Sequence, residues 1–147
     1  MKIFKKILFA TDLTVASDPA FRQALELAGD NKAELIIAHA YEPPNAAQAA
    51  AVGPGVYEEW DENLRSQAEA GIAPLVDRAR EAGVTARALA VSGDAADAIA
   101  ERAKANGVDL VIMGTQGRKG VSRLFLGSVA TRVISTAPCP VMTVRAA

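Results

Sequence analysis

The sequence predicts an α/β protein of one domain, a five-stranded parallel β-sheet with helices on both faces. Short runs of Val, Ile and Leu alternate along the chain with Ala-rich segments whose apolar residues recur at helical spacing. Aromatic residues make up only 5% of the chain, so the core is aliphatic, which suits a buried parallel sheet. A chain of 147 residues is the right size for one such domain, so we expect a single domain over 1–147. Strands alternating with helices imply right-handed crossovers between parallel strands.

Five segments have the apolar composition of buried strands. They are residues 7–10, 35–40, 84–91, 110–113 and 141–144. The third contains Thr85 and Arg87, and these polar residues indicate a strand at the edge of the sheet.

Three helices are predicted from their start and stop signals. The first begins at Ser17-Asp18-Pro19 and ends at Gly29. Another is capped by Asp94 and ends before Gly107, and the last includes Val129 to Ile134.

The segment between the second and third strands predicts a loop followed by a long helix. Residues 42–55 are rich in Pro, Gly and small residues without periodicity, which is typical of a loop. Apolar residues then recur every three or four positions over 57–79. Gly71 and Pro74 fall inside this helix, and proline removes one hydrogen bond, so we expect a kink or a break there.

Charge and composition exclude several classes of partner. The chain has 16 basic and 17 acidic residues and a net charge of −1, which gives no overall field for binding nucleic acid. No apolar run is long enough to serve as a signal-peptide core or to span a membrane, so no membrane partner is expected. The single cysteine, Cys139, forms no intrachain disulfide and fits a reducing compartment, so the expected location is the cytoplasm.

Two strand ends carry residues suited to ligand binding. Ala10-Thr11-Asp12 ends the first strand, and a glycine-rich connection, Met113-Gly114-Thr115-Gln116-Gly117 onward, follows the fourth. Ligands of open parallel sheets bind beyond the carboxyl ends of strands where the strand order reverses. Gly127 directly precedes the last helix, whose free N–H groups favour an anion such as phosphate.

The glycine-rich connection differs from two common nucleotide-binding motifs. The chain has no Gly-Lys-Ser/Thr, and its first strand-to-helix turn, 11–14, has no glycine. A P-loop NTPase and a dinucleotide-binding dehydrogenase are therefore disfavoured.

The spacing Gly-x2-Gly-x9-Gly-Ser, formed by Gly114, Gly117, Gly127 and Ser128, resembles the ATP-binding motif of the universal stress protein family. The flanking sequences agree with this resemblance. Residues 5–12 are similar to the opening strand of the family, His39-Ala40 to the end of its second strand, and 137–141 to the entry into its last strand.

The resemblance implies a Rossmann-like sheet with strand order 3-2-1-4-5, similar to the adenine nucleotide alpha hydrolases, and a site for ATP with Mg²⁺ or Mn²⁺. Adenine would contact the first two strand ends, and Asp12 would face the ribose or a phosphate-bound metal. The phosphates would lie on Gly127 and the three residues after it. The nucleotide-binding residues implied in this way are Ala10, Thr11, Asp12, Ala40, Met113, Gly114, Gln116, Gly117, Arg118, Gly127, Ser128, Val129 and Ala130.

Several of these residues also have simpler interpretations. Asp12 is compatible with a turn or cap, and the cations Arg118, Lys119 and Arg123 with solvated loop residues. His39, the only histidine, is expected to be a hydrogen-bonded strand-end residue, because no nucleophile is evidently paired with it.

The resemblance is to the ATP-binding, UspA-like subgroup and implies a nucleotide-dependent sensor or switch. No water-activating group is recognisable, so at most slow ATP hydrolysis is expected. A homodimer through residues 141–144 and a further, unidentified protein partner are also implied. Two alternatives stay open: an ATP-independent dimeric interaction protein of the same fold, and a nucleotide-transferring enzyme of the related superfamily.

Overall fold

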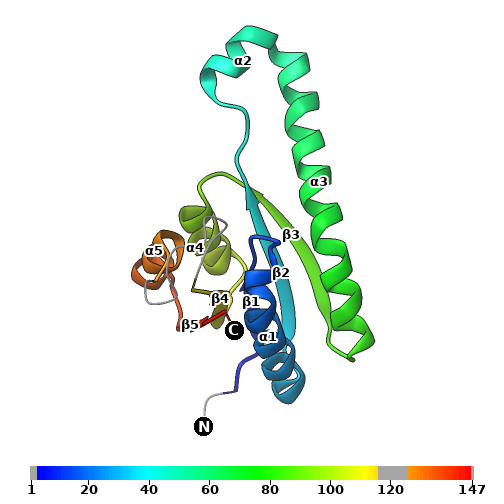
Figure 1. Ribbon diagram of the computed structural model, residues 1–147, viewed down its shortest axis with the longest axis vertical. Helices are drawn as coiled ribbons and strands as arrows, with labels where there is room; N and C mark the ends of the chain where they lie inside the picture. The colour runs from blue at the N-terminus through cyan, green and yellow to red at the C-terminus, as the bar shows by residue number, and fades with distance from the viewer. Residues whose placement is uncertain (1–2, 116–125, 147) are drawn as a thin grey trace.

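A computed structural model describes residues 3–115 and 126–146 and shows one parallel sheet covered on both faces by helices (Figure 1). Its strands are β1 (Lys6–Ala10), β2 (Glu34–Tyr41), β3 (Ala86–Ser92), β4 (Leu110–Gly114) and β5 (Val141–Val144). They lie in the order β3-β2-β1-β4-β5, and every neighbouring pair is parallel. The predicted fold class and strand order are therefore confirmed, and β3 lies at an edge as its polar residues indicated.

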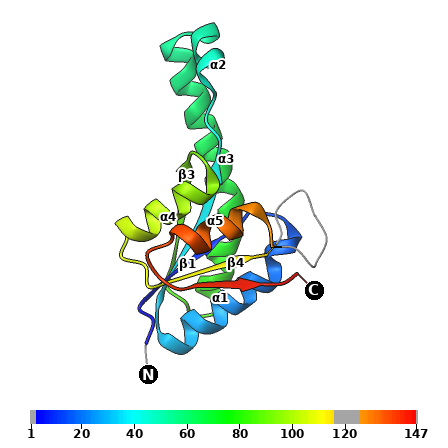
Figure 2. The ribbon, with the colours of Figure 1, turned by 90° about the vertical axis from the view of Figure 1, so that its left-hand side faces the viewer.

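The helices divide between the two faces of the sheet. They are the short 3-10 helix η1 (Val15–Ser17), α1 (Asp18–Asn31), α2 (Ala46–Val52), α3 (Pro54–Glu81), α4 (Ala95–Ala105) and α5 (Ser128–Thr136). α1 and α3 pack on one face, and α4 and α5 on the other (Figure 2). We call these the α1/α3 face and the α4/α5 face. Each has its own apolar core, because successive side chains of a strand point to opposite sides.

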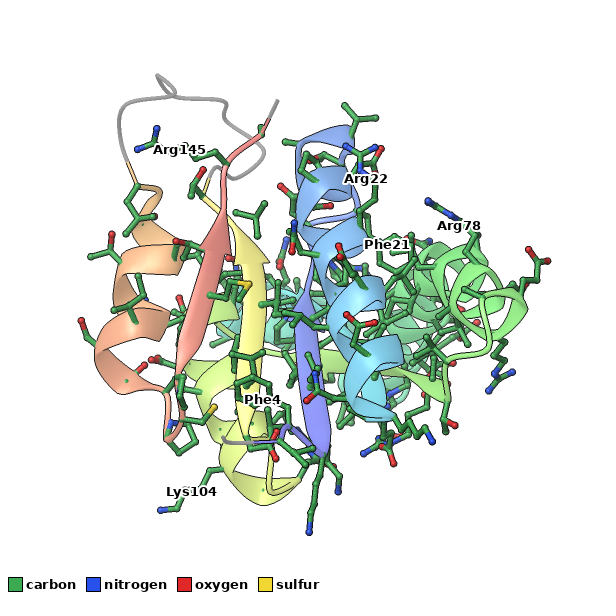
Figure 3. The ribbon with its side chains drawn as sticks, turned by 90° about the horizontal axis from the view of Figure 1, so that it is seen from below. Phe4, Phe21, Arg22, Arg78, Lys104 and Arg145 are labelled. Atoms are coloured by element: carbon green, nitrogen blue, oxygen red, sulfur yellow. The ribbon has the colours of Figure 1, made fainter. Side chains whose placement is uncertain are left out.

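The core of the α1/α3 face is the larger. Phe9 and Ile37 from the sheet, Phe21 from α1 and Ile72 from α3 are at most 1% exposed. The Phe9 and Phe21 ring centroids are 5.5 Å apart. Arg78 of α3 lies over the outer side of Phe21, its guanidinium carbon 4.8 Å from the ring centroid (Figure 3). This cation–π contact joins α1 to α3 at the surface of the core.

The predicted loop over 42–55 is wrong from Ala46 onward, except at Gly53. Residues Ala46–Val52 form α2, because Asn45 and Gln48 make a capping box and five of the seven helix residues are alanine. α2 and the amino-terminal half of α3 form an arm that extends away from the sheet (Figure 1).

Two predicted helix boundaries differ from the structure: α3 has no break at Gly71 or Pro74, and α1 does not end at Gly29. α3 continues through Gly71 and Pro74, because Ile72 and Val76 anchor both sides of the proline in the core. α1 continues past Gly29 to Asn31 and ends at Lys32, whose φ of 53° closes the helix in the left-handed conformation.

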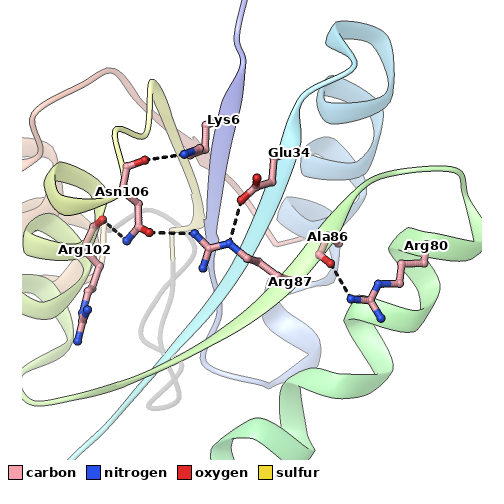
Figure 4. A network of polar contacts seen from close by, with 7 residues as sticks. All are labelled: Lys6, Glu34, Arg80, Ala86, Arg87, Arg102 and Asn106. Carbon is pink, nitrogen blue, oxygen red and sulfur yellow. Dashed lines mark hydrogen bonds and ion pairs between the residues drawn. The ribbon is translucent and has the colours of Figure 1, made fainter.

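Side chains tie the strands together at the amino end of the sheet (Figure 4). Arg87 of β3 donates to Glu34 of β2 and to the side chain of Asn106, each at 2.9 Å. Lys6 of β1 donates to the Asn106 carbonyl at 2.9 Å. Asp109 accepts from the backbone N–H groups of Lys5 and Lys6. The cavity described below lies at the opposite, carboxyl end of the sheet.

Candidate functional site

A cavity of about 1030 Å³ lies at the carboxyl end of the strands. A volume of this size is at the upper end of the range for small-molecule sites. It lies between the ends of β1, β2 and β4, the start of α5 and the middle of α3. Its lining includes Ala10, Thr11, Asp12, Ala40, Met113, Gly114, Gly127, Ser128, Val129 and Ala130.

The structure thus brings together ten of the predicted site residues around one cavity. The other three, Gln116, Gly117 and Arg118, lie outside the described residues. Prediction missed the α3 wall, Leu64, Gln67 and Ala68, and also His39 and Tyr41 of β2. The position of His39 and Tyr41 at the end of a predicted strand could have identified them as site residues. Nothing in the sequence indicates that α3 lies against the cavity.

The turn after β1 is held in one conformation by its own side chains. Asp12 Oδ1 accepts from the backbone N–H of Thr14 at 2.9 Å and from its hydroxyl at 2.7 Å. Thr11 Oγ1 accepts from the N–H of Leu13 at 3.0 Å and lies 2.9 Å from the Ser17 hydroxyl. Asp12 therefore does serve as a turn residue, while its carboxyl group also lines the cavity.

Leu13 has a strained backbone and a close neighbour. Its φ of 65° is unusual for a bulky residue. Its side chain packs where α3 carries Gly71, and a Cβ on Gly71 would lie 2.6 Å from Leu13 Cδ1. The absence of a side chain at Gly71 therefore allows the β1 turn to pack directly on α3.

The end of β2 presents backbone groups to the cavity. Residues of β2 alternate in the neighbour that they bond: Glu34 and Ala38 bond to the β1 side, and Leu35 and Tyr41 to the β3 side. Ala40 therefore points its N–H and C=O toward β1, but the β1–β2 register ends at the pair Ala10–Ala38. No group within residues 3–115 and 126–146 is hydrogen-bonded to the Ala40 N–H.

Small apolar side chains flank these groups on the α4/α5 face. Ala10 and Met113 are each 6% exposed and belong to the core of that face, together with Ile99 of α4. Ala40 is on the same side of the sheet by alternation with Ala38. Their small size leaves room for a flat group against the strand ends.

The start of α5 lines the opposite part of the cavity. Gly127 precedes the helix, donates its N–H to Thr115 at 2.7 Å and accepts from the Thr131 N–H and hydroxyl. The N–H groups of Ser128, Val129 and Ala130 have no partner within the helix, because they belong to its first turn. Together with the helix dipole they favour an anion at this point.

An ion-pair cluster joins the starts of the two helices on this face. Arg132 of α5 donates to Asp94 at 3.1 Å and to Asp97 at 2.8 Å. Asp94 also caps α4 by accepting from the Asp97 N–H at 3.2 Å. This backbone hydrogen bond, together with Arg132, lowers the pKa of Asp94 below its ordinary value of 3.8. Within the described residues, no three His, Cys, Asp or Glu side chains are grouped to hold a metal ion.

His39 fits its simpler predicted role as a hydrogen-bonded strand-end residue. His39 Nδ1 lies 2.8 Å from the Thr11 carbonyl oxygen and is therefore the donor, because a carbonyl only accepts. Cys139 is partly buried and packs against the core of the α4/α5 face. Among the described helices, none has the length and hydropathy needed to cross a membrane.

The fold and the strand-end cavity are those of a doubly wound α/β domain, in which ligands bind at the carboxyl ends of the strands. The family model "Universal stress protein family" matches residues 3–145, so the chain belongs to the universal stress protein family. A universal stress protein of Thermus aquaticus is 36% identical over 147 residues, which covers 97% of this chain and 100% of the relative.

Two solved structures show how well the fold agrees. Universal stress protein UspA from Lactobacillus plantarum superposes with a TM-score of 0.82 at 21% identity, covering 99% of this chain and all of that protein. A universal stress protein solved in complex with cAMP has a TM-score of 0.71 at 25% identity, with the same coverage of both chains.

Proposed function

We propose that this protein binds ATP, with Mg²⁺ or Mn²⁺ accompanying the phosphates, and acts as a nucleotide-dependent sensor or switch. The observation that carries the proposal is the placement of two complementary features in one cavity. The Ala40 N–H and C=O are suited to the edge of a base, and the first turn of α5 is suited to phosphate. The universal stress protein solved with cAMP supports an adenine nucleotide as the ligand class.

The residues present fit this ligand at each of its parts. An adenine edge has a ring nitrogen that accepts next to an amino group that donates, which matches one N–H and one C=O from the same residue. Guanine matches this pair at neither edge in the same orientation: its N1 edge has the donor and acceptor in reversed order, and its N7 edge has two acceptors and no donor. Asp12 at the end of β1 lines the same cavity and would serve the ribose hydroxyls or a phosphate-bound cation. Mg²⁺ bound with few carboxylates and with substrate phosphates needs no larger acidic cluster.

The arrangement favours binding over catalysis. ATP hydrolysis needs a residue that orients or activates water near the γ-phosphate. The only carboxyl groups on the described lining are those of Asp12 and Glu42, and Asp12 Oδ1 is already occupied by Thr14. Bound ATP would therefore persist and mark a state of the protein.

Isothermal titration calorimetry with ATP and GTP, each with Mg²⁺, tests the proposal. We expect heat with ATP and clearly weaker binding of GTP. Gly127→Val should abolish binding, because the new side chain would project where backbone meets phosphate. Gly55→Val is the matched control, since a Cβ at Gly55 meets nothing within 4 Å and the residue is on the arm. Normal ATP binding by Gly127→Val, or equal affinity for GTP, would contradict the proposal.

We also propose a homodimer formed by β5. This strand is at the sheet edge and all four of its residues are half-buried. Pro140 and Val144 accept from β4, so the alternate residues Val141 and Thr143 direct their backbone groups outward. Thr143→Pro removes an outward N–H and should yield a monomer in light scattering, whereas Thr143→Val should stay dimeric. A wild-type monomer would refute this proposal.

A further inference from the structure

The hydrogen-bond ladder between β1 and β2 ends one hydrogen bond before the position that the strand register would permit. The N–H of Thr11 donates to the Ala38 carbonyl at 2.9 Å, so the hydrogen-bonding pattern extends to Thr11. The next bond of a parallel ladder would run from the Ala40 N–H to the Thr11 carbonyl. That bond is not among those made by the described residues. The Thr11 carbonyl instead accepts from His39 Nδ1 at 2.8 Å.

We propose that His39 is a positioning residue that keeps the Ala40 N–H available to a purine base. A carbonyl oxygen has two lone pairs, so the imidazole ends the ladder at Thr11 by holding that carbonyl in the direction of His39 Nδ1, away from the Ala40 N–H. The open N–H next to the open C=O of Ala40 then forms the edge that reads adenine. The ligand part of this inference rests on the proposed function, while the competition for the Thr11 carbonyl does not.

The surroundings of His39 suit this role. On β2, His39 alternates with Ala40, so its side chain is on the α1/α3 face while the small wall of Ala10 and Met113 is on the other. His39 therefore contacts the end of β1 from the α1/α3 face and leaves the α4/α5 face, where adenine would bind, unobstructed. Its bond to a buried strand end also fixes the Nδ1–H tautomer and the ring orientation.

Amide exchange of the nucleotide-free protein tests the competition directly. NMR should show fast exchange at the Ala40 amide in the wild type. In His39→Leu the Thr11 carbonyl becomes available to Ala40, and exchange should slow by about tenfold or more. His39→Asn should remain fast, because its amide nitrogen can donate in place of Nδ1. If His39→Leu does not fold, His39→Ala serves in its place. Unchanged exchange at Ala40 in the apolar variant would overturn the inference, whether or not the protein binds ATP.

Binding of ATP, 1-deaza-ATP and 7-deaza-ATP tests the consequence for recognition. Each analogue lacks one ring nitrogen that could accept from the Ala40 N–H, so wild type should bind one of them roughly tenfold more weakly than ATP. His39→Leu should bind ATP about tenfold more weakly and lose that discrimination, and His39→Asn should recover it. Ile37→Val is the matched control on the same strand face: Ile37 is buried in the core of the α1/α3 face and is not among the residues that line the cavity. It should discriminate like wild type.

The outcomes separate the inference from the proposed function. Wild type that binds no ATP refutes the function, and the exchange measurement then decides the role of His39 alone. If wild type and His39→Leu discriminate equally between ATP and its deaza analogues, the inference about His39 is overturned and the proposed function still stands.

Discussion

Gly71→Ala tests whether the β1 turn is packed directly on α3. In an exposed helix interior this substitution stabilises by about 1 kcal/mol, because glycine is a poor helix former. Here the new Cβ would lie 2.6 Å from Leu13 Cδ1, and 3.7 and 3.9 Å from two further Leu13 carbons. A contact under 3 Å requires the terminal methyl of Leu13 to turn away, which offsets part of the gain in helix propensity. We therefore expect Gly71→Ala to stabilise the protein by clearly less than the ~1 kcal/mol of an exposed helix interior.

The same substitution should stabilise more when Leu13 is first shortened. In a Leu13→Ala background the clash is absent, so Gly71→Ala should stabilise by the full amount of about 1 kcal/mol. The double-mutant cycle then gives a coupling of roughly 0.5–1 kcal/mol between two residues that are 58 positions apart in sequence. Urea unfolding followed by the fluorescence of Trp60, the only tryptophan, measures all four proteins. If Gly71→Ala stabilises the wild type as much as it stabilises the Leu13→Ala variant, the turn is not packed on α3 as described.

Three further predictions concern the core, the helix start and turnover. Ile72→Ala, at a residue with no exposed surface, should destabilise by about 2–5 kcal/mol in urea unfolding, and a loss below 1 kcal/mol would mean that Ile72 is not buried. Asp94→Asn keeps a capping oxygen but loses the charge that faces Arg132, so wild type should be more stable than the variant above pH 3.8. Because the pKa of Asp94 is lowered in the folded state, this difference in stability should disappear as the pH falls through the folded pKa. A stability difference that is unchanged at the lowest pH would contradict the prediction. Single-turnover assays should give ATP hydrolysis far below the median enzyme rate of about 10 per second, and a rate near that median would favour an enzyme.

Most of the fold could be predicted because its strands are short, apolar and separated by strong stop signals. The run 7–10 and the pair Asp94 and Gly107 each marked an element that the structure contains. The errors occurred where one residue type was given too much weight. Pro74 lacks one N–H, but burial of the residues around it outweighs that loss, and the alanines after Asn45 form a helix despite the glycines and prolines nearby.

The site was predictable only where it is made by strand ends and the start of a helix. Residues such as Asp12 and Gly127 were identified because topology places the carboxyl ends of parallel strands together. Leu64 and Gln67 look like ordinary helix-surface residues in sequence, and only the packing of α3 across the sheet brings them to the cavity. Likewise, the sequence indicates that His39 ends a strand, but not that its ring bonds to the neighbouring strand.

The two ends of the sheet are organised in opposite ways, and this difference bears on how a ligand could act. At the amino end, Asp109 accepts from the backbone N–H groups of Lys5 and Lys6. Arg87 joins the side chains of Glu34 and Asn106 there (Figure 4). At the carboxyl end, β2 is still paired with β3 but runs past its last partner on the β1 side at Ala40, and the adjoining turn holds Leu13 at a φ of 65°. An unpaired edge and a strained residue both cost free energy in the absence of a ligand. A nucleotide that hydrogen-bonds the edge would therefore change the stability of this end far more than that of the other, and hydrogen exchange with and without ATP should show protection confined to the carboxyl end.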